Sequence, residues 1–238
     1  MEPERRRPLF DSYVGITIAP PQAEFAKERV RKTDDATTTS NNEAQGRSTP
    51  AIRIFAADAA DPASWNPELQ QAVFGFGGDA EREGGQDAGA GTETWLLALD
   101  TLYHFKPSRK PLLRRACRDL GASFMAFDLL ISEHASFLDK LVLRIMCLVT
   151  GIPFSNFLCR KEYEDMLVDV GYERHLIEMR DISEHVFSGI AGHIWRKDRE
   201  LKRYGMSMGK FRGPAKAFDW WARSGLVRGF IVVARRTG

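Results

Sequence analysis

The chain has little of what would place a protein in a membrane, outside the cell or on a nucleic acid. Its first residues, MEPERRRPLF, carry charge and no apolar core, which excludes a secretory signal. The three cysteines, Cys117, Cys147 and Cys159, are an odd number without close metal-type spacing, so we expect neither a disulfide framework nor a metal site. The net charge of +2, without a basic face interleaved with aromatic residues, disfavours nucleic acid as a partner. These absences favour a cytoplasmic protein.

Long apolar runs are also scarce. The most lipophilic part of the chain is the window FLDKLVLRIMCLVTGIPFSNFL, which contains Lys140 and Arg144 and is interrupted at Gly151 and Pro153. The remaining apolar run is too short to span a bilayer, so we expect no stable membrane insertion. We interpret the window as a buried or cap-forming helix, with a helix lying on a membrane surface as the alternative.

What is present is an alternation of apolar strands and amphipathic helices. Strands are expected at 14–18, 51–58, 122–130, 173–182 and in the closing RGFIVVARR, and 94–105 is expected to be a strand that runs into a loop. The alternation predicts an α/β fold, a largely parallel sheet with helices on both faces, in a single domain over residues 1–238. The polar or glycine-rich stretches 33–50 and 75–92 predict disordered loops, and 131–160 predicts a lid or cap segment.

The ends of the expected strands carry polar side chains. In open α/β sheets, ligands bind outside the carboxyl ends of the strands. The residues at those ends are Thr17, Asp58, Asp100 to His104, and Asp128. We therefore expect the functional site among them.

Four segments carry a resemblance to a known family. In chain order they are GITIAPPQAEFAKERV, FAADAADPASW, LLALDTLYHF and WWARSGLVRGFIVVARR. Their order and spacing resemble the class I S-adenosylmethionine-dependent methyltransferases, in the branch with cyclopropane-fatty-acid synthases and sterol and small-molecule methyltransferases. The resemblance covers nearly everything from Tyr13 to Arg236. It implies a Rossmann-like sheet with an antiparallel final strand, and S-adenosylmethionine as cofactor.

The resemblance also implies a cofactor site. The family run after its second strand, which contacts the cofactor, corresponds to Gly15, Thr17, Ile18 and Gln22. Asp58 is expected to accept a hydrogen bond from the adenine amino group, and Ala59 leaves room for the ring. Taken alone, Asp58 could instead cap the helix that follows. Thr17 could be a strand-end residue with a capping hydroxyl, and Gln22 an exposed residue of the first helical turn.

The candidate catalytic residues follow the third expected strand. The resemblance places Asp100, Tyr103 and His104 beside the methyl donor. His104 is the candidate general base for an oxygen acceptor, and a core histidine bonded to the backbone is the alternative. Tyr103 is expected to orient the acceptor or to face the sulfonium, whose positive charge an aromatic ring stabilises.

One part of the family pattern has no counterpart before Tyr13. The family begins with a strand and a glycine-rich loop of the type D/E-x-G-x-G-x-G, and MEPERRRPLFDS is too short to encode them. We therefore expect an N-terminally truncated form or, alternatively, a natural remnant without catalysis. The retained Asp58, Asp100 and His104 favour truncation. Residues 1–238 should bind the cofactor weakly, and the strands at Val14 and Trp95 should face a gap or pair directly.

The sequence thus predicts methyl transfer to a small, apolar organic acceptor, impaired in this form. The apolar segment 131–160 suits a lipid-like or polyketide-like acceptor, although its side chains would serve equally as core and lid packing. The alternative is a non-catalytic, methyltransferase-like interaction protein. Another nucleotide-binding α/β enzyme is disfavoured, because no phosphate-binding glycine loop stands at a strand-to-helix turn.

Overall fold

The computed structural model describes residues 10–40, 51–75 and 93–236, and the chain divides into two compact units, Met1–Ala90 and Gly91–Gly238. The single domain expected over 1–238 stays a prediction. Most of the two expected loops, 41–50 and 76–92, lies outside the described residues.

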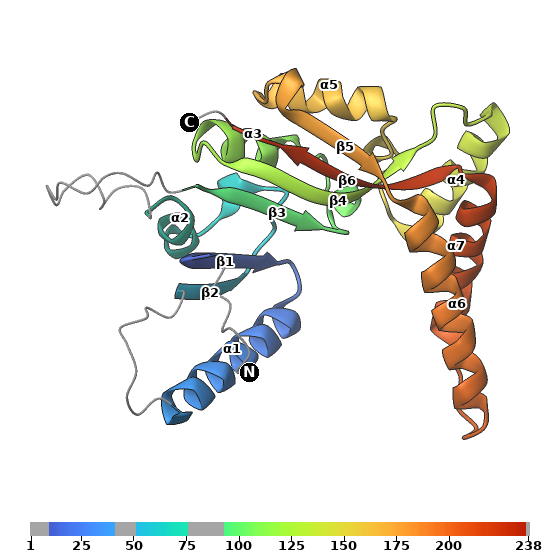
Figure 1. Ribbon diagram of the computed structural model, residues 1–238, viewed down its shortest axis with the longest axis horizontal. Helices are drawn as coiled ribbons and strands as arrows, with labels where there is room; N and C mark the ends of the chain where they lie inside the picture. The colour runs from blue at the N-terminus through green and yellow to red at the C-terminus, as the bar shows by residue number, and fades with distance from the viewer. Residues whose placement is uncertain (1–9, 41–50, 76–92, 237–238) are drawn as a thin grey trace, which may run out of the picture. The chain divides into compact units, whose positions relative to one another are not determined.

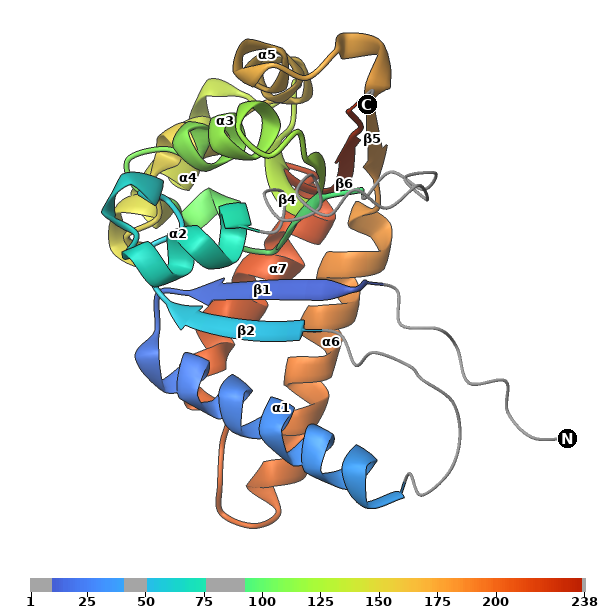
Figure 2. The same ribbon diagram turned by 90° about the vertical axis from the view of Figure 1, so that its left-hand side faces the viewer.

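The first unit is built on two parallel strands. Its elements are β1 (Ser12–Thr17), α1 (Pro20–Ser40), β2 (Ala51–Ala56), the short 3-10 helix η1 (Pro62–Ser64) and α2 (Pro67–Phe74). β1 and β2 pair in register from Ser12 opposite Ala51 to Thr17 opposite Ala56, and they lie side by side in Figures 1 and 2. The first strands and helix expected from the sequence are therefore confirmed.

Helix α1 is longer than the sequence suggests. It continues to Ser40, so the loop expected from residue 33 is wrong over 33–40. Its middle carries ion pairs one turn apart, Lys27 with Glu24 at 3.0 Å and Lys32 with Glu28 at 2.7 Å. Such pairs support a helix in solvent, and polar residues alone do not end one.

The second unit holds a four-stranded sheet in the order β3-β4-β6-β5. Its strands are β3 (Trp95–Leu99), β4 (Ser123–Ile131), β5 (Ile177–Asp181) and β6 (Val227–Ala234). β3 runs parallel to β4, whereas β6 runs antiparallel to both β4 and β5. The expected antiparallel final strand is confirmed. In the described chain β1 and β3 belong to different sheets, so they do not pair directly.

Helices cover both faces of this sheet. They are α3 (Lys110–Arg118), α4 (Phe137–Thr150), α5 (Arg160–Val170), α6 (Ser183–Lys202) and α7 (Arg212–Ser224), with short 3-10 helices η3 (Leu102–His104), η4 (Phe154–Asn156), η5 (Arg174–Leu176) and η6 (Gly209–Phe211). α3 and α5 lie together on one face of the sheet (Figure 1). α6 and α7 pack against each other as a long pair.

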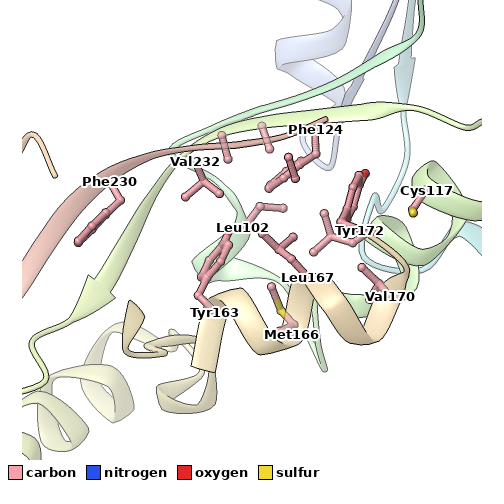
Figure 3. Close-up of a cluster of buried hydrophobic side chains, with 14 of the residues drawn as sticks. Leu102, Cys117, Phe124, Tyr163, Met166, Leu167, Val170, Tyr172, Phe230 and Val232 are labelled. Atoms are coloured by element: carbon pink, nitrogen blue, oxygen red, sulfur yellow. The ribbon is translucent and has the colours of Figure 1, made fainter. Parts of the chain in front are cut away.

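Two clusters of buried side chains form the core of the second unit. Successive residues of β4 point to opposite faces, so Phe124 and Leu130 join one cluster while Leu129 joins the other. Figure 3 shows the first cluster, in which one face of α5 packs toward the sheet. That face is the one expected from the spacing, namely Tyr163, Met166, Leu167 and Val170. The second cluster draws on α4, α6 and α7.

Candidate functional site

The chain turns abruptly where β3 ends, at Asp100. This residue has a φ of 57°, the left-handed region that residues other than glycine seldom enter. Its backbone N–H donates to the carbonyl of Phe127 at 3.0 Å, and its Oδ1 accepts from the Tyr103 hydroxyl at 2.9 Å. Strained backbone held by specific contacts is typical of functional positions. The turn directs a carboxylate to the carboxyl end of the parallel pair.

Tyr103 lies on η3 directly after this turn and is buried. Its ring centroid is 4.2 Å from that of His104 and 6.2 Å from that of Phe157. Burial raises the pKa of Tyr103, and the neighbouring Asp100 carboxylate raises it further. The phenol therefore stays protonated and donates to Asp100 throughout the physiological pH range.

His104 is exposed at the end of η3, so the alternative of a core histidine is wrong. Partial burial of its ring lowers the pKa of His104, and the negative charge of Asp100 opposes this shift. The imidazole is consequently neutral at pH 7, the form in which it can accept a proton. The structure thus brings together three of the expected site residues, Asp100, Tyr103 and His104.

A buried ion pair that the sequence did not reveal lies beneath η3. The guanidinium of Arg109, 1% exposed, donates through Nη1 to Oδ2 of the fully buried Asp128. The same carboxylate accepts from the Tyr163 hydroxyl at 2.9 Å and, through Oδ1, from the Leu129 N–H at 2.9 Å. Asp128 therefore has a structural role, and it lies inside β4 opposite Phe230 rather than at the strand end where we expected it.

Asn156 connects this pair to the candidate site. Its side-chain amide donates to the carbonyls of Tyr103 at 3.1 Å and Phe105 at 2.7 Å, while its own carbonyl accepts from Arg109 Nη2 at 2.5 Å. η3 is therefore fixed to η4 and to β4 by groups far apart in the sequence. No spacing rule could have found them, because each bond joins separate elements.

In the first unit, Thr17 and Gln22 meet at the junction of β1 and α1. The Thr17 hydroxyl accepts from the Ala19 N–H at 3.3 Å and donates to Gln22 Oε1 at 2.9 Å. Both simpler interpretations, a capping hydroxyl for Thr17 and an exposed first-turn position for Gln22, agree with these contacts. The two expected cofactor residues are nevertheless adjacent.

Asp58 lies two residues beyond β2, at the same edge of the two-stranded sheet as Thr17. Its Oδ1 accepts from the Ala60 N–H at 2.8 Å, and its carbonyl accepts from the Trp65 indole N–H at 2.8 Å. The residues that precede η1 and α2 are Asp61 and Asn66, so Asp58 caps neither helix. The helix-cap alternative is wrong, and the carboxylate is fixed by a local turn.

The other expected contact residues flank these positions. Gly15 pairs with Ile54, and a Cβ at Gly15 would lie 2.7 Å from Ile54 Cδ1, so a larger residue would displace that side chain. Ile18 is 74% exposed immediately after β1. Ala59 is half-buried beside Asp58. Their cofactor roles stay predictions.

In the part of the chain that the structure describes, no three His, Cys, Asp or Glu side chains are grouped so that they could hold a metal ion. The helices of residues 10–40, 51–75 and 93–236 include none that combines the length and apolarity needed to cross a membrane.

Comparison with known proteins rests on structure, because neither a protein-family model nor a curated protein sequence matches the chain. A phosphoethanolamine N-methyltransferase 2 from Haemonchus contortus, bound to phosphomonomethylethanolamine and S-adenosylhomocysteine, aligns over 94% of this chain with a TM-score of 0.62 and 13% identity. This chain spans only 43% of that protein.

Two other solved structures are similar. A proposed sarcosine dimethylglycine methyltransferase from Galdieria sulphuraria has a TM-score of 0.61 and 10% identity, over 95% of this chain and 70% of the other. A geranyl diphosphate C-methyltransferase from Streptomyces coelicolor A3(2) has a TM-score of 0.52 and 14% identity, over 94% and 64%. At these identities, the likeness establishes the fold alone.

Proposed function

Because the chain has the Rossmann-like fold of S-adenosylmethionine-dependent methyltransferases, we propose that it binds S-adenosylmethionine and takes part in methyl transfer to a small organic acceptor. The observation that carries the proposal is the group at the end of β3. There a strained Asp100 is held by Tyr103 next to a neutral, exposed His104. The fold alone does not specify the reaction. This group supplies a carboxylate that accepts hydrogen bonds, Asp100, and a base, His104.

Methyl transfer from a sulfonium is an in-line displacement. The acceptor atom bonds to the methyl carbon as the carbon–sulfur bond breaks, and the sulfur leaves as a neutral thioether. The protein therefore needs chiefly to align donor and acceptor and to exclude water. For an oxygen acceptor, neutral His104 would take the hydroxyl proton. Tyr103, whose hydroxyl donates to Asp100, would orient the acceptor or face the sulfonium with its ring.

The residues of the first unit are assigned to the adenosine. Asp58 would accept from the exocyclic amine of adenine, with Ala59 leaving space for the ring. Thr17 and Gln22 would contribute hydroxyl and amide groups, and Gly15 and Ile18 would line the approach. Support comes from the Thr17–Gln22 hydrogen bond and from the shared sheet edge of Thr17 and Asp58.

For the acceptor, we propose a small, apolar molecule. The segment expected to form a lid, 131–160, contributes Leu143, Cys147 and Phe157 to the buried cluster that also holds Tyr103. One similar structure is named as a methyltransferase of geranyl diphosphate, a molecule with a hydrocarbon chain. An apolar lid would also exclude water from the methyl donor.

Saturation-transfer NMR with the full chain and S-adenosylmethionine tests the proposal, since the method detects weak as well as tight binding. Adenosyl protons should receive saturation, and S-adenosylhomocysteine should compete it away. Asp58→Ala and Asp100→Ala should each reduce the signal several-fold, whereas the control Glu178→Ala, at an exposed position on β5, should not. The proposal would be contradicted if the folded protein transferred no saturation to the adenosyl protons. It would also be contradicted if the two aspartate variants gave the same signal as the unchanged protein.

A second candidate is a non-catalytic, methyltransferase-like interaction protein. Leu97 and Leu99 of β3, an edge strand of the four-stranded sheet, are exposed and favour it, because an apolar edge strand offers a partner both side chains and unpaired backbone groups. In that case the NMR experiment would show no adenosyl contact, and variants at Asp58 and Asp100 would leave partner binding unchanged.

A further inference from the structure

Helix α4 has an exposed face composed entirely of hydrocarbon. Its large apolar residues on this face, with their exposed fractions, are Phe137 80%, Leu138 69%, Leu141 45%, Val142 44%, Ile145 53%, Leu148 79% and Val149 82%. At 100° per residue they fall within an arc of about 140°, and no polar side chain interrupts it. We call these seven residues the α4 apolar face.

The opposite side of the helix is anchored in the protein. Leu143 and Cys147 are 1% and 4% exposed and belong to the second core cluster. A capping box between Ser136 and Asp139 fixes the first turn, with Asp139 N–H to Ser136 Oγ at 3.1 Å, and Gly151 ends the helix at a φ of 72°. The helix therefore cannot rotate to bury the α4 apolar face without losing its packing on the core.

The charges on α4 are placed asymmetrically. Lys140 and Arg144 are exposed and lie along one border of the α4 apolar face. Arg144 also rests over the Phe154 ring, 5.7 Å from its centroid. The acid on the helix, Asp139, accepts from Ser136 and lies on the side turned toward the protein. A hydrocarbon face bordered by cations is the pattern of helices that lie in a bilayer interface.

We propose that α4 docks the protein flat on an anionic lipid surface, with its apolar face among the acyl chains and Lys140 and Arg144 at the headgroups. A 14-residue helix is about 21 Å long, which suits lying in the interface and excludes crossing it. The inference does not depend on methyl transfer.

Two features favour lipid over a protein partner. The α4 apolar face offers no hydrogen-bonding side chain and no Tyr, Trp or Arg, the residues that dominate protein–protein hot spots. A second copy of the same helix would bring Lys140 and Arg144 toward their own counterparts, and like charges disfavour that pairing. Anionic lipid offers acyl chains to the apolar side chains and negative headgroups to Lys140 and Arg144.

Vesicle co-sedimentation with the full chain tests the proposal. Vesicles of phosphatidylcholine mixed with phosphatidylglycerol should bind the protein, and pure phosphatidylcholine should bind it less. The variant Phe137→Gln/Leu148→Gln/Val149→Gln keeps good helix formers and should lower the partition coefficient by more than about tenfold. Lys140→Glu/Arg144→Glu should lower binding to the anionic vesicles by roughly tenfold.

The matched control replaces exposed apolar residues elsewhere in the second unit. Tyr204, Met206 and Phe211 are 77%, 55% and 51% exposed, and Tyr204→Gln/Met206→Gln/Phe211→Gln should leave vesicle binding unchanged. Light scattering and thermal unfolding of every variant accompany the assay. Absence of vesicle binding, equal loss in the control, a dimer abolished by the α4 variant, or a loss of thermal stability in that variant would each overturn the proposal.

Discussion

The two units of the chain differ most in how much they bury. In the first unit, described at 10–40 and 51–75, the buried apolar residues are mostly small: Ala23, Ala60, Trp65, Leu69 and Ala72. The second unit holds two clusters of large buried side chains on opposite faces of its sheet. A parallel pair of strands lacks independent stability, whereas a four-stranded sheet packed by helices has it. The expected site residues of the second unit, Asp100 to His104, therefore lie on a better packed part of the chain than Thr17 and Asp58 of the first unit.

The largest expected effect separates the two units physically. Residues 91–238 expressed alone should unfold cooperatively in urea, because their core lies within that fragment. Residues 1–90 alone should show no cooperative transition, since few large side chains are buried there. Circular dichroism during a urea titration measures both. A cooperative transition in the first fragment and none in the second would reverse the comparison.

A smaller effect is expected from the buried ion pair of the second unit. Arg109→Met leaves the Asp128 carboxylate buried without its cation and should lower the free energy of unfolding by about 3–5 kcal/mol. The control Arg114→Met, at an exposed position on α3, should change it by less than about 0.5 kcal/mol. Denaturant titrations of both variants measure the two changes in the free energy of unfolding. Equal effects would show that Asp128 finds another partner.

The smallest effect concerns pH, and it should arise in the second unit, which contains all five histidines. The pKa of His104 is lowered in the folded state from its ordinary 6.5, so the unfolded chain binds the proton more tightly. The stability contribution of His104 is therefore present above pH 6.5 and is lost as the pH falls below that value. In the variant His104→Gln, the free energy of unfolding should change less with pH below pH 6.5. An unchanged slope in urea titrations above and below pH 6.5 would contradict the assignment.

Much of the architecture could be predicted, because strand and helix periodicities act locally. The face of α5 formed by Tyr163, Met166 and Leu167 followed from spacing alone. The residue at which α1 ends could not be predicted from the sequence. Residues 33–40 are polar with a run of threonines, and intrinsic propensity is too weak to decide where a helix stops in solvent.

The candidate site was predictable only where its residues are neighbours in the chain. Asp100, Tyr103 and His104 could be grouped because one turn carries them. Arg109 and Asn156 could not, because they reach the site through contacts between separate elements. The exposure of α4 could not be decided, because the sequence allows both a buried or cap-forming helix and one that lies on a membrane surface. Hydrophobic sequence shows that a helix has an apolar face, whereas the rest of the fold determines whether that face is covered.

Photoaffinity labelling with an azido-adenosyl analogue of S-adenosylmethionine, read by peptide mass spectrometry, tests the central claim most directly. The account predicts label on the peptide carrying Asp58, with protection by excess S-adenosylhomocysteine. Label spread over other peptides, without protection, would contradict it.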